Sequence, residues 1–582
     1  MGMTLVEKML ARASGKASVK PGDIVLPEPE LVILHDGYVE TAYKQLHDIG
    51  YRRVTHPERV VFVTDHQVVY TTPASILRGR ANRRIAGEWR IGHFHDAGQG
   101  GHGHLFPMES GLVRPGMFLF AYDMHCTNFG AIGAFAMRAG PNVVSVLATG
   151  TTWTVVPHTL RVTLEGEPPP GVHPRDVGFW LAHRLTSGEL GVEFDYRVVE
   201  FGGSYCDRLP LSGRVALCNT LTEIGVLNIV FPPMLPLGSA RDPTWLESDD
   251  DARFEHTLVL DVSHLAPQVA LPGAPDQAVP VDDTVGVAID QAYLGSCGSG
   301  MYEDFQAAAD VLAGHHVASG VRFIVVPGTV ETAGRMARSL RRRRRRAAGL
   351  RRSVDLDRRH QWPGPHGREG CPLLSGQPAH RGRVGRRRQD RRSAPRRIEE
   401  SPSMNWIQRG TAHVLGHDVP HDGAVMAFDI VLSRNTNPDE LIPHLFAELD
   451  PGLVGRIRSG DLIVAGGNFL AGKAHNAGII AMKALGLGIL CESMSVRAFQ
   501  GVVALAVPTL ASCHGIADAL CDGDEIEVDY ANGTVTRCAT GEIHHYPPLA
   551  PEIRAMIGNG GMRGALLAHL RAHPELGQPY AE

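Results

Sequence analysis

Residues 59–66 read "RVVFVTDH", a valine-rich apolar run that ends in an aspartate and a histidine. Similar runs occur at residues 117–125, "MFLFAYDMH", and at residues 321–328, "VRFIVVPG". Continuous β-branched and aromatic runs of this length predict strands that are buried on both faces. Between them lie alanine-rich stretches that we interpret as helices, "GAIGAFAMRAG" at 130–140 and "YEDFQAAADVLAG" at 302–314. Strands that alternate with helices predict an α/β fold.

Length and composition predict a multidomain, cytoplasmic protein. The chain has 582 residues, 43% of them hydrophobic, and single hydrophobic cores stop growing at about 250–300 residues. No apolar run approaches the ~20 residues that a membrane helix needs, and the N-terminal residues have no cleavable apolar core. The nine cysteines include no C-x-x-C pair, which favours free thiols or a metal role over disulfides.

Arginine is concentrated in one segment. Residues 341–400 contain about 20 arginines, no lysine and six acidic residues, a formal charge near +14 in a chain whose total is −5. The rest of the chain is therefore near −19, whereas binding to a phosphate backbone requires clustered cations. We expect no nucleic-acid binding by the folded domains.

Three segments differ in pattern. Residues 1–336 carry the α/β pattern, whereas residues 337–403 are rich in Arg, Gly, Pro and Gln and offer no apolar face that could be buried. Residues 404–582 return to regular patterns. We therefore predict a large first region, a segment that does not pack, and a second, smaller domain.

The second domain shows strand, helix and hairpin patterns. "DLIVAGGNF" at 461–469 and "GVVALAVPTL" at 501–510 are interpreted as strands, and "NAGIIAMKALGLG" at 476–488 as a helix that ends at glycine. "DGDEIEVDYANGTVT" at 522–536 predicts a hairpin, because Asn-Gly favours the turn that joins two twisted strands.

Polar residues follow the predicted strands of the first region, at the ends where α/β proteins form ligand sites. They are Asp65 and His66, His104 and Glu109 in "GGHGHLFPMES", and Asp123 and His125. A histidine beside an aspartate is more often a structural hydrogen-bonded pair than a catalytic one. Three such groups, each followed by a glycine-rich or proline-rich turn, favour one shared polar site.

Cys297 lies among glycines and serines in "YLGSCGSGMYED", between a strand-like run and a predicted helix. Free backbone N–H groups and the helix dipole would stabilise a thiolate there. The alternative is an ordinary buried cysteine, but the Gly-Ser context is too open for that reading.

Four stretches together resemble the large subunit of 3-isopropylmalate dehydratase, in the aconitase superfamily. The resemblance runs from residue 3 to about 335, and from about 405 to the end the chain resembles the small, swivelling subunit of the same enzyme. The stretches in the first region are "HDAGQGGHGHLFPMESGLVRPG", "VPHTLRVTLEGEPPPGVHPRDV", "LSGRVALCNTLTEIG" and "LGSCGSGMYEDFQAAADVL"; those in the second are "GTAHVLGHDVPHD", "NPDELIPHLFAELDPGL" and "SGDLIVAGGNFLAGKAHNAGIIAMKALG". The resemblance implies a fused hydro-lyase that needs no separate small subunit.

The resemblance implies a catalytic role for five of the strand-end residues. They match the acid–base and hydroxyl-orienting groups of the family, with Met124 in place of a serine: Asp65, His66, His104, Asp123 and His125. Glu109 matches the glutamate of the motif that holds His104. The implied substrate is a small hydroxy di- or tricarboxylic acid.

The resemblance also implies a 4Fe-4S cluster, held by three thiolates, whose open iron makes hydroxide a tolerable leaving group. Cys297 matches the first cluster cysteine, although Gly298 and Ser299 replace the Thr and Asn that follow it in the family. Ser299 is assigned to substrate binding. The other two cysteines, a Cys-x-x-Cys motif some 60 residues later in the family, are absent, and one cysteine cannot hold the cluster.

The second domain departs from the family at its Gly-Ser-Ser-Arg-Glu loop, which falls on residues 472–476, "GKAHN". Lys473 could replace the serine base if burial depressed its pKa, and a protonated His475 could bind a carboxylate. The alternative is loss of the ancestral reaction. Phe428 falls at another substrate-binding arginine of the family, and Arg434 is the nearest substitute.

The resemblance stops near Ser339 and resumes near Arg397 with a similar number of residues between. A length-preserving loss confined to one span, with arginine but no lysine codons, indicates a shifted reading frame in a GC-rich gene. The competing interpretation is a genuine disordered basic linker.

Three functions remain open from the sequence. The first is a hydro-lyase or isomerase that dehydrates and rehydrates a hydroxy di- or tricarboxylic acid. The second is an RNA-binding protein on the same scaffold, since cluster-free relatives of aconitase bind RNA, and a disordered basic arm binds phosphates without sequence preference. The third is an inactive chain.

Overall fold

The computed structural model describes residues 2–233, 243–339, 405–433, 435–472 and 475–580. By their contacts, the described residues up to Ala333 and those from residue 405 onward belong to one compact unit. Most of the arginine-rich segment, including its six consecutive arginines, lies outside the described residues. The division at residues 336 and 404 stays a prediction.

A five-stranded parallel sheet forms the centre of the first region, in the order β4-β3-β2-β5-β6. Alternate residues of its strands enter two different cores: Ile33 and Val61 pack in one, Val32 and Phe62 in the other. Both faces are therefore covered, which explains the unbroken apolar runs. Its strands are β2 (Leu31–His35), β3 (Val60–Val63), β4 (His93–His95), β5 (Phe118–Ala121) and β6 (Phe135–Arg138). The α-helices of this part are α1 (Leu5–Ala13), α2 (Asp36–Ile49), α3 (Pro73–Glu88), α4 (Phe106–Glu109) and α5 (Val143–Thr149).

The helix predicted at residues 130–140 is wrong. A 3-10 segment, η2 (Met124–Ile132), ends at Gly133, whose φ of 77° lies in the left-handed region, and strand β6 follows. Phe135, Ala136 and Met137 are buried on both faces of the sheet. A fully buried strand shows no alternation of polar and apolar residues, so its alanines read equally well as a helix.

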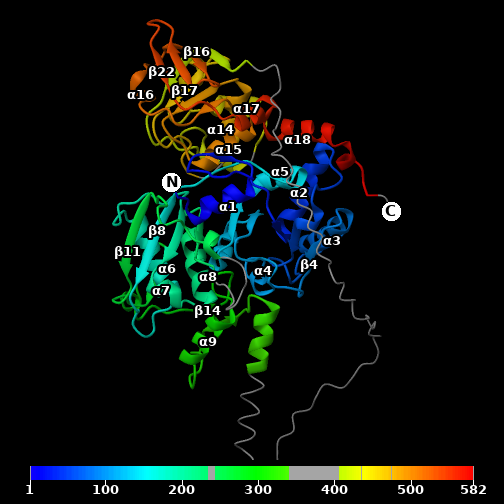
Figure 1. Ribbon diagram of the computed structural model, residues 1–582, viewed down its shortest axis with the longest axis vertical. Coiled ribbons are helices and arrows are strands. Elements are labelled where there is room, and N and C mark those ends of the chain that lie inside the picture. Colours follow the sequence, from blue (N-terminus) through cyan, green and yellow to red (C-terminus); the bar gives the residue numbers. More distant parts are fainter. Residues whose placement is uncertain (1, 234–242, 340–404, 434, 473–474, 581–582) are drawn as a thin grey trace, which may run out of the picture. The chain divides into compact units, whose positions relative to one another are not determined.

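A second parallel sheet has the order β10-β9-β8-β11. Figure 1 shows helices α6, α7 and α8 beside strands β8 and β11. The elements are β8 (Thr159–Glu165), α6 (Pro174–Thr186), β9 (Val198–Gly202), α7 (Ser204–Arg208), α8 (Leu211–Thr222), β10 (Asn228–Val230) and β11 (His256–Asp261). Three two-stranded pairs complete this region: β1 (Ile24–Val25) with β7 (Thr154–Val155), β12 (Gln268–Ala270) with β13 (Ala278–Pro280), and β14 (Gln291–Leu294) with β15 (Arg322–Val325). The predicted helix at 302–314 is observed as α9 (Tyr302–Val311).

The second region contains a seven-stranded mixed sheet, β19-β18-β17-β16-β20-β21-β22. Strands β16 to β19 pair in parallel, and β20 to β22 add an antiparallel meander. The predicted Asn-Gly hairpin is confirmed: β20 and β21 pair, and Gly533 has a φ of 69°. The strands are β16 (Ile407–Val414), β17 (Leu462–Ala465), β18 (Gly488–Cys491), β19 (Thr509–Leu510), β20 (Glu525–Asp529), β21 (Thr534–Arg537) and β22 (Ile543–His545). The helices are α11 (Phe428–Ser433), α12 (Pro438–Leu441), α13 (Leu453–Arg456), α14 (Ala477–Ala484), α15 (Val496–Ala504), α16 (Ile516–Ala519), α17 (Pro551–Gly558) and α18 (Gly561–Ala572).

The strand predicted at residues 501–510 is largely wrong. Helix α15 continues through Ala504, and only β19 is a strand. Ser495 begins the helix, because its hydroxyl accepts the N–H of Ala498. That signal lies outside the apolar run, and the run alone does not separate a buried helix from a strand. The α/β class is confirmed, and no described helix is both long and apolar enough to cross a membrane.

A buried ion pair in the second region predicts a stability effect. Asp461 accepts hydrogen bonds from His413 at 2.9 Å and from the backbone N–H groups of Arg458 at 2.7 Å and Thr411 at 3.0 Å. Burial raises the pKa of Asp461, but these bonds outweigh it and lower the pKa. We expect Asp461→Asn to cost about 1.5–3 kcal/mol at pH 7, since hydrogen bonds to charged groups contribute that much.

Urea denaturation at several pH values measures this effect. A carboxyl whose folded pKa is depressed stabilises above its unfolded pKa of about 3.9, and that stability is lost as the pH falls. The difference between the wild type and Asp461→Asn should therefore shrink below pH 4. A difference that stays constant down to pH 2 contradicts the account.

Candidate active site

Three neighbouring strands of the five-stranded sheet carry the polar residues at their carboxyl ends. The chain runs outward from β2 to β3 and β4 on one side and to β5 and β6 on the other, so the order reverses between β2 and β5. Ligand sites of open α/β sheets form at such a reversal. His35 ends β2, Asp65 follows β3, and Asp123 follows β5. The sheet thus brings the predicted strand-end residues together.

Asp65 is the centre of the first group. Its carboxylate accepts hydrogen bonds from His35 Nδ1 and His66 Nδ1, both at 2.8 Å, and from the backbone N–H of Gly103 at 2.8 Å. Burial raises the pKa of Asp65, but the charge and hydrogen bond of His35 and the hydrogen bond of His66 lower it far more. The hydrogen bond to Asp65 raises the pKa of His66, against the effect of burial. Asp65 is therefore an anion that anchors two imidazoles.

Asp123, His125 and Glu223 form the second group. His125 Nδ1 lies 3.4 Å from Asp123 Oδ1, and its Nε2 bonds Glu223 Oε1 at 2.6 Å. Burial lowers the pKa of His125, but the hydrogen bonds to the two carboxylates outweigh it and raise the pKa to about 10. At neutral pH His125 is therefore an imidazolium. Both of its N–H groups face carboxylates, and Glu223, the partner of Nε2, is the more exposed of the two.

His104 lies between the two groups. Its ring centroid is 4.3 Å from that of His35 and 5.9 Å from that of His125, and the side chain is 1% exposed. Burial lowers the pKa of His104 well below its usual value, so the ring is neutral. Neither ring nitrogen has a hydrogen-bond partner in the described part of the chain. Buried polar atoms are almost always bonded, and exceptions mark functional positions.

Cys297 follows β14 and precedes α9, as predicted. Its sulfur accepts a hydrogen bond from Asn219 Nδ2 at 3.2 Å, and its carbonyl accepts one from Asn128 at 2.9 Å. Asn128 lies in η2, the segment that begins after Asp123 and contains His125, so this contact places Cys297 close to the second group.

Arg175 explains the Gly298 and Ser299 substitutions. A β-carbon at position 298 would collide with Arg175 Nη2 and with the side chain of Asn219. The same Nη2 donates to Ser299 Oγ at 3.1 Å, and Nη1 donates to Thr220 Oγ1 at 2.8 Å. Ser299 therefore holds a guanidinium beside Cys297, and its predicted substrate contact stays a prediction.

The residues present do not fit the three-thiolate cluster that the resemblance implies. Cys126 and Cys218 are buried, and burial raises the pKa of both thiols. Among the described residues, no group of three metal-binding side chains includes a cysteine. The whole sequence contains no Cys-x-x-Cys pair, and Cys371 lies outside the described residues. The assignment of Cys297 as a cluster ligand stays a prediction.

The remaining predicted residues fall into three cases. Glu109 does not join the imidazoles; it accepts hydrogen bonds from Thr329 and Thr332 and so ties α4 to the segment after β15. His475 is described, and Asp422 accepts its Nδ1 hydrogen bond at 2.8 Å. Lys473 and Arg434 lie outside the described residues, and Phe428, at the start of α11, is 55% exposed.

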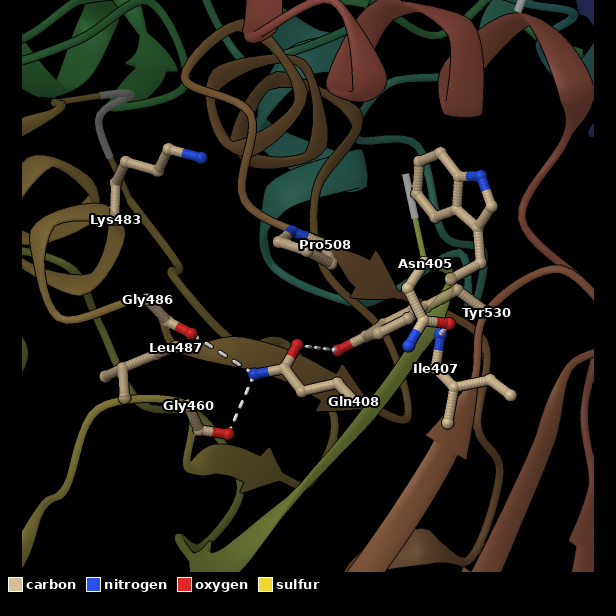
Figure 2. A pocket seen from close by; sticks show the side chains of 10 residues that line it. Asn405, Ile407, Gln408, Gly460, Lys483, Gly486, Leu487, Pro508 and Tyr530 are labelled. Atoms are coloured by element: carbon tan, nitrogen blue, oxygen red, sulfur yellow. Dashed lines mark hydrogen bonds between the residues drawn. The ribbon is translucent and has the colours of Figure 1, made fainter. Parts of the chain in front are cut away.

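A cavity of about 310 Å³ lies elsewhere, at the amino ends of strands β16 to β19. Figure 2 shows Gln408 among its lining residues, bonded to the carbonyls of Gly460 and Gly486 and to Tyr530. Lys483, which also lines it, donates to the carbonyl of Ala506 at 2.7 Å. These polar groups already bond one another, and no aspartate, glutamate or histidine lines the cavity.

Sequence reasoning missed four residues of the site. His35 showed no motif of its own. Arg175 lies in "VPHTLRVTLEGEPPPGVHPRDV", and Asn219 and Glu223 lie in "LSGRVALCNTLTEIG", both quoted above for the resemblance alone. Glu223 follows directly after the last residue of α8, and its side chain bonds His125. A polar residue next to the end of an apolar helix was the available signal.

Imidazoles and carboxylates gather where the strand order of an α/β sheet reverses. Such a site is suited to an enzyme that transfers protons. The model of the aconitase family, described as aconitate hydratase, matches residues 7–234 and 238–343, more than half of the chain. The chain belongs to the aconitase family, and with it to a class of hydro-lyases.

Curated relatives match the same region. The 3-isopropylmalate dehydratase large subunit 1 of Methanopyrus kandleri is 38% identical over 343 residues, which are 57% of this chain and 79% of that one. The probable methanogen homoaconitase large subunit of Methanothermobacter thermautotrophicus is 38% identical over 341 residues, 56% of this chain and 78% of that one. A solved structure of 3-isopropylmalate dehydratase (leuD) from Methanocaldococcus jannaschii aligns with 29% of this chain and 98% of its own, at 24% identity and a TM-score of 0.27.

Proposed function

We propose that the chain dehydrates and rehydrates a hydroxy di- or tricarboxylic acid of the isopropylmalate or aconitate type. The observation that carries the proposal is the convergence of two carboxylate-anchored histidine groups beside Cys297, in a family of hydro-lyases. Relatives named dehydratase and homoaconitase support the substrate class.

The proposed chemistry assigns a proton to each group. Dehydration removes hydrogen from a carbon next to a carboxylate and expels a hydroxyl from the neighbouring carbon. The substrate hydroxyl displaces the part-exposed Glu223 from Nε2 of the His125 imidazolium, and Nε2 then donates its proton to that hydroxyl, so that water leaves. Asp123 holds the ring at Nδ1. General acids of this kind contribute about 10²–10⁴-fold to a rate. The positive charge of His125 also attracts the substrate carboxylate.

Residues 404–582 are proposed to supply the part that the family carries as its small subunit, so that no separate subunit is needed. In this reading Lys473 is the base, and His475, Arg434 and Ser299 contact the substrate. A bound 4Fe-4S cluster would act as a Lewis acid on the hydroxyl, and Cys297 would be one of its ligands. The residues present do not hold this cluster, so the proposed steps rest on the acid–base groups alone.

Turnover tests the proposal directly. We expect conversion of isopropylmalate, citrate or a one-carbon homologue to the enoate, followed as the absorbance of the new conjugated double bond. The gene is first resequenced, and any corrected chain is assayed beside the 582-residue chain. Absence of turnover on all three acids by both chains contradicts the proposed function.

Replacement of Lys473 by alanine is expected to lower turnover by about 10²–10⁴-fold, the contribution of a general base. Lys483→Ala serves as the matched control, because this lysine is hydrogen-bonded to a carbonyl in a separate cavity. Initial rates at saturating substrate measure both variants. Full activity of Lys473→Ala removes this lysine from the mechanism.

A further inference from the structure

We infer that Asp422 and His475 form an acid–base dyad, in which His475 transfers protons through Nε2 and His421 fixes the carboxylate. The inference rests on the proposed function for its substrate. It changes the role of His475 from a carboxylate clamp to the base that removes the carbon-bound proton, the role that the proposed function gives to Lys473, and turnover of Lys473→Ala and His475→Gln decides between the two. Neither histidine follows from the family pattern, which has an arginine where this chain has His475.

The three side chains meet at one carboxylate. His475 Nδ1 lies 2.9 Å from Asp422 Oδ1 and 2.8 Å from Oδ2, and His421 Nδ1 lies 2.8 Å from Oδ1. Burial raises the pKa of Asp422, but the hydrogen bonds of the two histidines outweigh it and lower the pKa. The carboxylate is therefore ionised and accepts from both rings.

A backbone contact fixes the tautomer of His421. Gly478, in the first turn of α14, donates its N–H to His421 Nε2 at 3.2 Å. Nε2 therefore carries a lone pair, and the proton of the neutral ring must lie on Nδ1, facing Asp422. Burial lowers the pKa of His421, which keeps the ring neutral. His421 is thus a positioning residue that orients Asp422.

The same tautomer argues against a metal ion at this place. The ligand atoms of His421, Asp422 and His475 lie within 4.8 Å of one another, close enough for one cation. A metal would need the Nδ1 lone pair of His421, and its Nε2 would then carry a proton that points at the N–H of Gly478. Two donors would face each other, so the hydrogen-bond pattern favours the dyad.

His475 is held at one nitrogen and open at the other. Its side chain is 37% exposed, and none of the described residues bonds its Nε2, whereas Nδ1–H points to Asp422. A carboxylate behind Nδ1–H orients an imidazole and stabilises its charged form. Nε2 takes the proton from the substrate carbon, the C–H electron pair becomes the double bond, and the hydroxyl leaves with a proton as water. Rehydration reverses each transfer.

The test measures the reactivity of His475 apart from turnover. Carbethoxylation of the intact chain by diethyl pyrocarbonate at pH 7, followed by peptide mass spectrometry, reports nucleophilic attack by Nε2. We expect Asp422→Asn to slow modification of His475 roughly tenfold, because the ring loses a hydrogen bond to a charged group. His573 is the internal control: its side chain is 38% exposed, against 37% for His475, and the carboxylate beside it, Glu575 at 3.4 Å, is itself exposed. The ring of His569 lies 4.5 Å from the ring of His573.

Two further readouts separate a dyad from a structural contact. Nitrogen-15 shifts of labelled histidine should show His475 protonated at Nδ1, and Asp422→Glu should restore much of the reactivity that Asp422→Asn loses. His475→Gln should reduce turnover by about 10²–10⁴-fold. Unchanged reactivity of His475 in Asp422→Asn overturns the dyad whatever turnover shows, and so does stoichiometric Co²⁺ binding that Asp422→Asn abolishes. Slowed reactivity without turnover by any variant leaves the dyad standing and removes the proposed function.

Discussion

Anaerobic reconstitution with iron and sulfide is expected to leave the 582-residue chain without a 4Fe-4S cluster. Such a cluster needs three thiolates at one place. Cys297 has an amide donor at its sulfur and a partly exposed position, as a ligand requires, but Cys126 and Cys218 are buried thiols. Iron and acid-labile sulfide per chain, with electron paramagnetic resonance of the reduced sample, measure the result.

The large subunit of Methanopyrus kandleri, 38% identical to this chain, is the matched control for reconstitution. Prepared in parallel, it should take up the cluster that the family is expected to carry. A full cluster in the 582-residue chain that disappears in Cys297→Ala contradicts the prediction, because it requires two further ligands. A cluster that survives Cys297→Ala contradicts the role of Cys297 instead.

The reading-frame hypothesis makes its own prediction. Resequencing should restore a Cys-x-x-Cys pair between Ser339 and Arg397, and the corrected chain should then gain a cluster on reconstitution. Mass spectrometry of the purified protein gives an independent check, since "RRSVDLDR" at 351–358 occurs only in the present frame. An unchanged gene sequence, together with detection of that peptide, contradicts the hypothesis and favours a genuine basic linker.

Much of the site could be predicted because its residues follow directly after strands. Asp65 and Asp123 end runs whose burial makes them recognisable, and parallel strands place their carboxyl ends at one edge. His35 and Glu223 were missed for a different reason: their partners, Asp65 and His125, are 30 and 98 residues away. The strand order brings His35 to Asp65, and the end of α8 brings Glu223 to His125. Neither can be predicted from the residues adjacent in sequence.

The wrong element predictions share one physical cause. Residues 130–140 and 501–510 are mostly buried and almost wholly apolar, so they show neither the period of a strand nor that of a helix. The signals that decided them were single residues: Gly133 in a left-handed conformation and Ser495 as a cap. His475 shows the same limit. The sequence predicted that it binds a substrate carboxylate as a cation, whereas in the structure its Nδ1 is bonded to Asp422, 53 residues earlier in the chain.

Replacement of His125 by glutamine is expected to flatten the pH dependence of stability and to remove turnover. The pKa of His125 in the folded chain is about 10, against about 6.5 for an unfolded histidine. A group whose pKa is raised on folding stabilises fully below the unfolded value, and this stability is lost as the pH rises toward 10. The wild type should therefore lose stability between pH 7 and 10.

In His125→Gln that loss should be absent, because a neutral amide faces Asp123 and Glu223 at every pH. The variant should be less stable than the wild type at pH 7 and close to it at pH 10, as urea denaturation midpoints will measure. His158→Gln is the control, since His158 is 50% exposed and lies 3.6 Å from Glu255. Turnover should fall by about 10²–10⁴-fold with the loss of the general acid. Midpoints that decline in parallel for His125→Gln and the wild type would show that His125 is not the cation, and the proton for the departing hydroxyl would have to come from another group.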